Sequence, residues 1–290
     1  MMFGKTHTLF RPPAEADSLI LRVADGCPWN GCTFCGMYKG VPYKFHGIEY
    51  AEKEFAKAAK RWPDARRIFL ADGDVMHLDF QTLETMLVSL NEKFRHLARV
   101  SIYANGASIL AKTGDELRRL KELKLHTLYM GLESGDNETL RAVNKRETAE
   151  EMIEAGRRAQ AADLRMSVMV LIGLAGKLRS AEHARATAEV LNKMLPRLLS
   201  ALRLVTTPNT SLYRSGFKMI PEFDAVAELR ELIQSLELEQ TVFRADHSSN
   251  IVPLEGRFPK DKERLIEQLD ALLASGHLDK NSPGRLPWSL

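Results

Sequence analysis

The amino-acid sequence predicts an α/β fold built on a parallel sheet. Short apolar segments without polar/apolar alternation recur along the chain, as expected of strands that are covered on both faces. An amphipathic stretch follows each of them, and a succession of six such β-then-α units favours a right-handed parallel barrel or open sheet. A length of 290 residues is common for a single core of this kind.

The elements follow in order along the chain. The six expected strands are Leu19–Ala24, Arg67–Ala71, Val100–Ala104, Thr127–Leu132, Met166–Gly173 and Ala201–Thr206. The six expected helices are Glu49–Arg61, Phe80–Leu97, Ser108–Lys124, Glu147–Ala162, Ala181–Leu195 and Asp224–Leu238. A capping-box pattern at Thr113-Gly-Asp-Glu116 marks a further helix start inside the third helix.

After about residue 215 the β/α alternation stops. A helix at 224–238, a polar segment at 244–250 and a last helical run at 261–274 follow, and the tail 281–290 is expected to be irregular. We therefore expect a core domain in residues 1–215 and a helical extension in residues 216–290 that packs on this core.

Composition and charge exclude several classes of protein. Hydrophobic content of 44% and charged content of 27% are ordinary for globular proteins, which excludes disordered and collagen-like chains. The net charge of +3 neither requires nor excludes a nucleic-acid partner. No apolar run is long enough to span a membrane, and residues 1–7 lack the apolar core of a signal peptide, so we expect a cytoplasmic protein.

All three cysteines lie within nine residues, Cys27-Pro-Trp-Asn-Gly-Cys32-Thr-Phe-Cys35. An odd, clustered set cannot form a disulfide framework, so the spacing indicates a metal or redox site in a reducing compartment. A four-iron cluster usually has four thiolate ligands, and three thiolates would leave one iron open, as a catalytic metal requires. Two alternatives remain: a zinc site completed by His46, or a redox pair in Cys32-Thr-Phe-Cys35 that leaves Cys27 unexplained.

Small, acidic and hydroxyl residues follow the predicted strands. In parallel sheets and barrels, functional residues gather at the carboxyl ends of the strands. These exits read Asp72-Gly-Asp74, Asn105-Gly106, Gly131-Leu-Glu-Ser-Gly135, Gly173-Leu-Ala-Gly176 and Thr206-Thr-Pro-Asn-Thr210. Turns after strands contain such residues in any case. A functional site is favoured here because the cysteine loop follows the first strand and therefore lies at the same edge of the sheet.

On these residues the chain resembles the radical S-adenosylmethionine (SAM) enzymes, from about residue 18 to 215. Those enzymes carry three cysteines spaced C-x3-C-x2-C after the first strand, with an aromatic residue before the last cysteine, as Phe34 is here. The first gap departs from that pattern, because four residues separate Cys27 from Cys32. A local kink in a loop with Pro and Gly can absorb the additional residue. The resemblance implies a partial (βα)6 TIM-like barrel with the helical C-terminal extension.

The resemblance also implies the ligands of two cofactors. Cys27, Cys32 and Cys35 would hold a [4Fe–4S] cluster. The implied SAM contacts are Asp72, Gly73, Asp74, Asn105, Glu133, Ser134, Lys145, Arg146 and Gly173. The Asp72–Asp74 turn would accept hydrogen bonds from the SAM ammonium. Asn105 and Glu133 would contact the ribose. Lys145 or Arg146 would pair with the methionine carboxylate. Gly173 would leave room for the adenine.

The implied reaction is the reductive cleavage of SAM to methionine and a 5′-deoxyadenosyl radical, which then acts on an unidentified substrate. The electron would come from a flavodoxin-like or ferredoxin-like donor. Arg203, His247 and Asn250 are candidate substrate contacts. Since no fourth cysteine exists in the chain, a cysteine-held auxiliary cluster is excluded. A different class of function also fits the cysteines: an iron–sulfur or zinc-binding carrier or regulatory protein without SAM chemistry.

Overall fold

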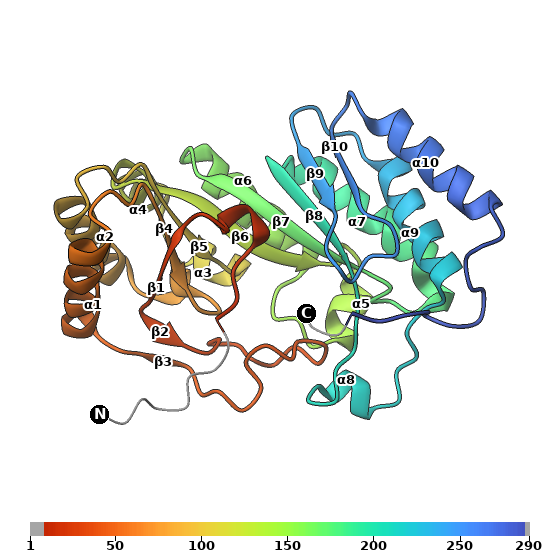
Figure 1. The fold of residues 1–290 in the computed structure, drawn as a ribbon, viewed down its shortest axis with the longest axis horizontal. Helices are drawn as coiled ribbons and strands as arrows, with labels where there is room; N and C mark the ends of the chain where they lie inside the picture. The colour runs from red at the N-terminus through yellow and green to blue at the C-terminus, as the bar shows by residue number, and fades with distance from the viewer. Residues whose placement is uncertain (1–8, 288–290) are drawn as a thin grey trace. The chain divides into compact units, whose positions relative to one another are not determined.

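The computed structural model of the protein describes residues 9–287 (Figure 1). Residues 1–7, on which the expectation of no export rests, lie outside the described residues, as do the last three residues of the tail. No helix in the described part of the chain is long and apolar enough to cross a membrane.

Eight strands form the main sheet, in the order β1-β4-β5-β6-β7-β8-β9-β10. Their bounds are β1 (Leu19–Arg22), β4 (Arg67–Ala71), β5 (Arg99–Tyr103), β6 (Leu125–Glu133), β7 (Arg165–Ile172), β8 (Leu198–Arg203), β9 (Val242–Ala245) and β10 (Leu254–Arg257). The pairs β1/β4, β4/β5, β5/β6, β7/β8 and β8/β9 are parallel, and β9/β10 is antiparallel. The mostly parallel sheet confirms the predicted α/β fold class.

Helices follow the strands as expected. They are α1 (Ile48–Arg61), α2 (Phe80–Lys93), α3 (Gly106–Leu110), α4 (Gly114–Glu122), α5 (Asn137–Ala142), α6 (Ala149–Ala161), α7 (Ser180–Met194), α8 (Ser211–Arg214), α9 (Glu222–Ser235) and α10 (Lys262–Ala274). Residues 9–287 also form short 3-10 helices and a small antiparallel ribbon. The 3-10 helices are η1 (Pro13–Glu15), η2 (Val75–His77) and η3 (Lys177–Arg179), and the ribbon pairs β2 (Ala24–Asp25) with β3 (Lys44–Phe45).

The stretch expected to form one helix at 108–124 forms two helices, and a capping box explains the break. The Thr113 hydroxyl accepts from the Glu116 amide at 3.2 Å, while the Glu116 carboxylate accepts from the Thr113 amide at 2.7 Å. Both exchanges satisfy amides at the helix start that lack an intrahelical partner. The capping pattern therefore predicted the start of α4 correctly.

The region after residue 216 contains α9 and α10, as expected, and also two strands. Strand β9 pairs in parallel with β8, and β10 pairs with β9. The polar segment expected at 244–250 therefore begins inside a strand. Phe243 and Ala245 of β9 are buried, but a four-residue strand is too short for a periodic pattern to reveal it. A domain boundary at residue 215 stays a prediction.

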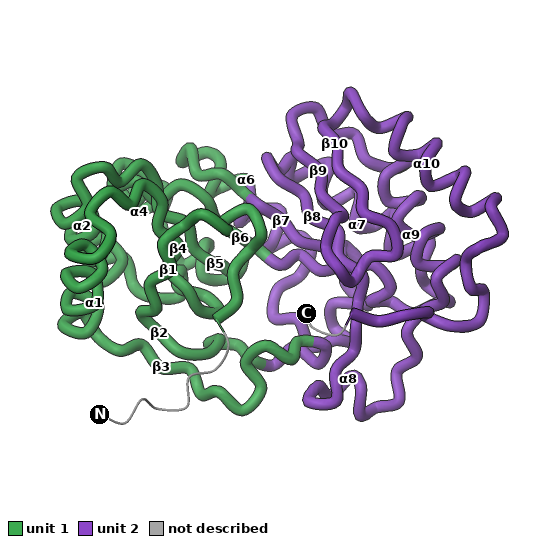
Figure 2. The backbone as a smooth tube through the Cα atoms, in the orientation of Figure 1, with its two compact units in different colours: residues 1–30, 35–130, 157–166 green, residues 31–34, 131–156, 167–290 purple. Residues whose placement is uncertain are grey.

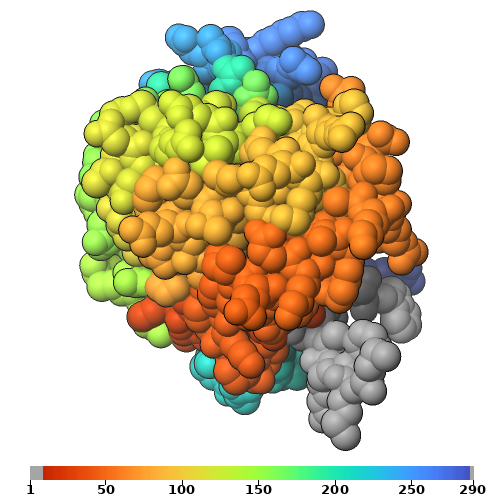
Figure 3. Space-filling model, turned by 90° about the vertical axis from the view of Figure 1, so that its left-hand side faces the viewer, coloured from red at the N-terminus to blue at the C-terminus, as the bar shows by residue number. Residues whose placement is uncertain are grey.

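The chain divides into two compact units, shown in Figure 2. Unit 1 comprises residues 1–30, 35–130 and 157–166, and unit 2 comprises residues 31–34, 131–156 and 167–290. In unit 1, α1 packs on α2, and Phe55, Phe69 and Phe94 fill the core. Figure 3 shows a face of unit 1 on which the orange-to-yellow segments that contain α1, α2 and α4 form a continuous surface. In unit 2, α9 packs between α7 and α10.

Candidate cofactor site

The three cysteines follow β2 in an irregular loop. All three are partly exposed, and none forms a disulfide. Cys27 and Cys35 belong to unit 1, and Cys32 belongs to unit 2. Among residues 9–287, no three or more His, Cys, Asp or Glu side chains are arranged to hold a metal ion. The convergence of the three thiols on one metal therefore stays a prediction.

The longer first gap of the cysteine loop contains a left-handed residue, Asn30, with φ of 41°. Its side-chain amide donates to the Tyr38 carbonyl at 2.8 Å and to the Val41 carbonyl at 3.4 Å. The Lys39 ammonium in turn donates to the Asn30 carbonyl at 2.6 Å. Asn tolerates this backbone region better than most residues. The left-handed residue in the four-residue gap is therefore Asn30 and not Gly31.

The turn after β4 lies directly against Cys27. The Gly73 amide donates to the Gly26 carbonyl at 3.0 Å. A Cβ on residue 73 would lie 2.6 Å from the Cys27 Cβ and 2.9 Å from the Cys27 Cα, distances that real structures do not allow. Only glycine fits at this position, so the predicted SAM-binding turn and the first cysteine are neighbours.

The two aspartates of this turn are buried. Asp72 is 1% exposed, has φ of 144°, and lies 3.5 Å from the Arg22 guanidinium. Asp74 accepts a hydrogen bond from the Ser108 hydroxyl at 2.6 Å. A non-glycine residue with such a φ stores about 1–3 kcal/mol of strain, and strain of this kind gathers at functional sites. Asp72 is therefore the stronger ligand candidate, and Asp74 also holds α3 against the turn.

Two tyrosines outside the predicted cofactor contacts lie beside the cysteines. Burial, with additional contributions from Asp72 and the Cys35 and Cys27 thiols, raises the pKa of Tyr38 well above its usual range. Burial and the Asp74 carboxylate raise the pKa of Tyr43 to about 12. Both phenols are thus neutral at physiological pH. Sequence order places both tyrosines after the loop, but no pattern in the sequence indicates that they are buried near the thiols.

In unit 2, Glu133 ends β6 in the left-handed region, with φ of 64°. Its Oε1 lies 3.8 Å from the Lys145 Nζ, and the two side chains are only 15% and 7% exposed. Burial raises the pKa of Glu133, and the Lys145 charge opposes this effect. The carboxylate folds back over Gly131, where a Cβ would lie 2.0 Å from Oε1. Arg146 is exposed, which favours Lys145 for a carboxylate ligand.

The remaining predicted SAM contacts differ in the hydrogen bonds that they already make within the protein. Ser134 is fully buried, and its hydroxyl accepts from the Asp136 amide at 3.0 Å, so it shapes the turn after β6. Asn105 stands at the N-cap of α3, but its side chain makes no capping hydrogen bond. Gly173 directly follows β7, with φ of 87°, and its amide donates to Glu228 at 2.7 Å.

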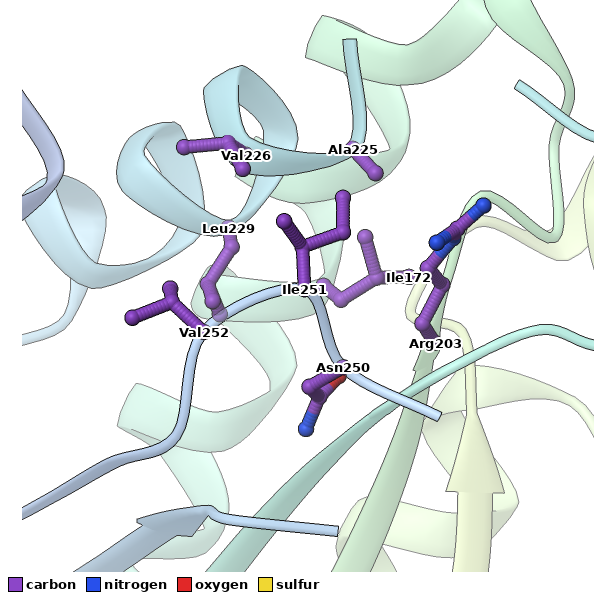
Figure 4. A pocket seen from close by; sticks show the side chains of 8 residues that line it. All are labelled: Ile172, Arg203, Ala225, Val226, Leu229, Asn250, Ile251 and Val252. Atoms are coloured by element: carbon purple, nitrogen blue, oxygen red, sulfur yellow. The ribbon is translucent and has the colours of Figure 1, made fainter. Parts of the chain in front are cut away.

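Two of the three candidate substrate residues line one small pocket in unit 2 (Figure 4). Its lining comprises Ile172, Arg203, Ala225, Val226, Leu229, Asn250, Ile251 and Val252. Arg203 is buried and donates to the Pro283 carbonyl, and burial lowers its pKa while Glu222 opposes this effect.

Asn250 donates to the Ala201 carbonyl at 2.9 Å, and the Nδ1 atom of His247 contacts the Ser249 hydroxyl at 2.8 Å. His247 is not part of the pocket lining. The pocket is thus lined by residues of β7, β8, α9 and the segment after β9. The role of these residues with substrate stays a prediction.

Comparison with known proteins identifies the family. Residues 21–182, more than half of the chain, match the Radical SAM superfamily. The chain belongs to the radical SAM superfamily. This membership makes it an enzyme and confirms the resemblance drawn from the cysteine loop and the strand exits.

Individual relatives of this radical SAM protein are distant. The heme chaperone HemW of Bacillus subtilis (strain 168) is 23% identical over 178 residues, which cover 60% of this chain and 46% of that protein. The chain spans about half the length of the curated relatives it matches (46% and 52%).

Two solved structures share the fold. The radical SAM methyltransferase TsrM of Kitasatospora setae, with cobalamin and a [4Fe–4S] cluster bound, matches with a TM-score of 0.56 and 14% identity over 71% of this chain and 41% of that chain. Methylornithine synthase (PylB) matches with a TM-score of 0.54 and 14% identity over 88% of this chain and 81% of that chain. At this identity the similarity concerns the fold, and it confirms the predicted fold class.

Proposed function

We propose that this enzyme holds a [4Fe–4S] cluster through Cys27, Cys32 and Cys35 and cleaves SAM reductively to generate a 5′-deoxyadenosyl radical. The observation that carries the proposal is the contact of the Gly73 turn with Cys27, which leaves no room for a Cβ. The Asp72–Asp74 turn, with its two buried carboxylates, would therefore lie next to Cys27, a proposed ligand of the cluster whose fourth iron is open to SAM.

The donor set of the chain fits an iron–sulfur cluster. Three thiols that are partly exposed and form no disulfide supply the soft ligands that iron–sulfur clusters take. The Gly73 turn adds a second fit, because its glycine permits close backbone approach to the first ligand. When bound, the reduced cluster supplies the electron that splits SAM into methionine and the 5′-deoxyadenosyl radical.

The chain's own residues would bind and orient SAM. The Asp72 carboxylate and the carbonyls of its turn offer acceptors to the SAM ammonium, a charge-assisted bond. In unit 2, the Lys145 ammonium would meet the methionine carboxylate, and the adjacent Glu133 carboxylate would accept from the ribose hydroxyls. Asn105 is available for a ribose contact, since its side chain does not cap α3.

Tyr38 has a different function in this proposal. Tyr38 is 3% exposed and lies near Cys27 and Cys35, so we propose that it limits the access of water to this side of the loop. The raised pKa keeps the phenol protonated, so Tyr38 adds no negative charge beside the thiolates. A water-poor surrounding also strengthens the electrostatic contacts to a charged ligand.

The proposal includes an electron donor of the flavodoxin or ferredoxin type and a reducing, cytoplasmic setting, which three cysteines without a disulfide support. The relatives are named for different activities, a heme chaperone, a methyltransferase and a methylornithine synthase. We therefore limit the proposal to the generation of the radical and assign no substrate.

Anaerobic reconstitution with iron and sulfide tests the proposal. We expect about four irons per chain, a changed electron paramagnetic resonance signal when SAM is added, and release of 5′-deoxyadenosine under dithionite. The Cys27→Ala variant should lose the iron and keep its far-ultraviolet circular dichroism. One tightly bound zinc per chain, with no 5′-deoxyadenosine, would favour a metal-binding protein without SAM chemistry.

A further inference from the structure

Glu228, on α9, is a buried carboxylate that accepts hydrogen bonds from three directions. Its Oε1 accepts from the Gly173 amide at 2.7 Å and contacts the His183 Nδ1 at 2.9 Å. Its Oε2 accepts from the Ser180 hydroxyl. Glu228 and His183 are each 2% exposed. This carboxylate therefore joins α9 to the end of β7 and the start of α7.

Core packing does not explain an acidic residue at this place. The neighbouring inward positions of α9, Ala225, Leu229 and Leu232, are apolar. A buried carboxylate is unfavourable unless hydrogen bonds replace its hydration, so an apolar side chain would be the simpler choice for packing alone. Glu228 instead accepts hydrogen bonds from the Gly173 amide and the Ser180 hydroxyl, which an apolar side chain could not do.

What Glu228 holds is the glycine turn after β7. Gly173 has φ of 87° and Gly176 has φ of 72°, and the Gly176 amide donates back to the Gly173 carbonyl at 3.2 Å. Two residues in the left-handed region give the turn many accessible conformations in the absence of a restraint. The bond from Oε1 to the Gly173 amide selects one of them.

We propose that Glu228 is a positioning residue for SAM, which sets the Gly173 turn in the conformation that receives the adenine. This inference rests on the proposed function, together with the place beside the adenine that the family resemblance implies for Gly173. In this proposal α9, far along the chain from the cysteines, contributes to SAM binding. One side chain accepts from both the Gly173 amide and the Ser180 hydroxyl, so it ties the turn after β7 to the start of α7.

Two measurements test the inference. The first is hydrogen–deuterium exchange of the 170–180 peptide in the protein without ligand. The second is the affinity of the anaerobically reconstituted protein for S-adenosylhomocysteine. Glu228→Met keeps the length of the side chain and removes both oxygens. In this variant we expect the 170–180 peptide to exchange about tenfold faster and S-adenosylhomocysteine to bind about tenfold more weakly. Glu228→Asp keeps the charge but is one methylene shorter, and we expect the same direction of change.

Conservative and control variants separate positioning from folding. Glu228→Gln still offers an oxygen to the Gly173 amide, so it should stay within about threefold of the unaltered protein. Glu231→Met, three residues along α9, removes a half-exposed ion pair with Arg185 and should change neither measurement.

The possible outcomes are distinct. If the unaltered protein binds neither SAM nor S-adenosylhomocysteine, the proposed function fails. If it binds them, and folded Met or Asp variants bind as tightly, the role of Glu228 is refuted. Should Glu228→Met not fold, Glu228→Asp decides between the two results.

Discussion

The side-chain amide of Asn30 donates to the main-chain carbonyl of Tyr38 over 2.8 Å, across the turn that follows Cys35. Asn30 stands in the longer first gap of the cysteine loop, and Tyr38 is buried beside Cys27 and Cys35. One amide thus joins the segment after the first cysteine to the segment after the third. Asn30 also has a left-handed backbone conformation, which Asn tolerates. One residue therefore both turns the loop and links its two ends.

We expect Asn30→Ala to lower cluster loading by half or more. Alanine in the left-handed region costs about 1–2 kcal/mol, and the lost amide leaves two carbonyls without this donor. Asn30→Gly keeps the backbone freedom, so its loss should be smaller. The measurement is iron and sulfide per chain after reconstitution. Asn91→Ala, which removes amide bonds to the Leu87 and Leu123 carbonyls, is the control and should load normally.

Gly73→Ala should prevent loading of the cluster. The added Cβ would overlap the Cys27 Cβ at 2.6 Å and the Gly26 carbonyl at 2.9 Å, and neither belongs to a flexible side chain. We expect a loss of about 1–3 kcal/mol in the free energy of unfolding, measured with urea, together with loss of iron. Gly114→Ala meets only the end of the Arg118 side chain at 3.4 Å, so it should load iron normally and keep or raise the stability. Normal iron content in Gly73→Ala would contradict the close approach.

Several features of the site were predictable because they depend on local order in the chain. Strand exits meet at one edge of a parallel sheet, so the sequence alone was enough to select Asp72 and Glu133 as candidates. Their positive φ values add a reason that the sequence does not contain. The turn at Asn30 could be expected from the length of the gap, but not its residue, because Pro28 and Gly31 are equally suited to bends.

Features that depend on contacts far apart in the sequence could not be predicted. Glu228 reaches Gly173 across 55 residues, and nothing in an amphipathic helix pattern distinguishes a buried glutamate from a solvated one. Strand β9 is likewise defined by its pairing with β8 and not by its own composition. A single sequence reports periodicity and local propensity, and these long-range pairings leave no trace in either.

Glu133→Gln should weaken the binding of S-adenosylhomocysteine about tenfold, because a carboxylate that accepts from ribose hydroxyls becomes a neutral amide. Burial raises the pKa of Glu133, so protonation begins at a higher pH than for an exposed glutamate. The affinity of the unaltered enzyme should therefore fall as the pH is lowered, while that of the variant changes less. Equilibrium dialysis between about pH 5.5 and 8 measures both. Glu138→Gln, an exposed residue paired with Arg179, is the control.

His126 should make the fold of unit 1 less stable in acid. Burial, and next the Arg165 charge, lowers its pKa from 6.5 to about 4, so the folded protein disfavours the charged imidazole. The unfolded chain binds the proton more readily, and the stabilisation present above pH 6.5 is lost as the pH falls toward 4. Since the group is only half-buried, we expect a difference of about 1 kcal/mol between pH 7 and 4.5 that His126→Gln abolishes. Urea unfolding at both pH values measures it, with the exposed His96→Gln as control. An equal pH dependence in the His126 variant and the unaltered protein would show that the half-buried imidazole does not contribute.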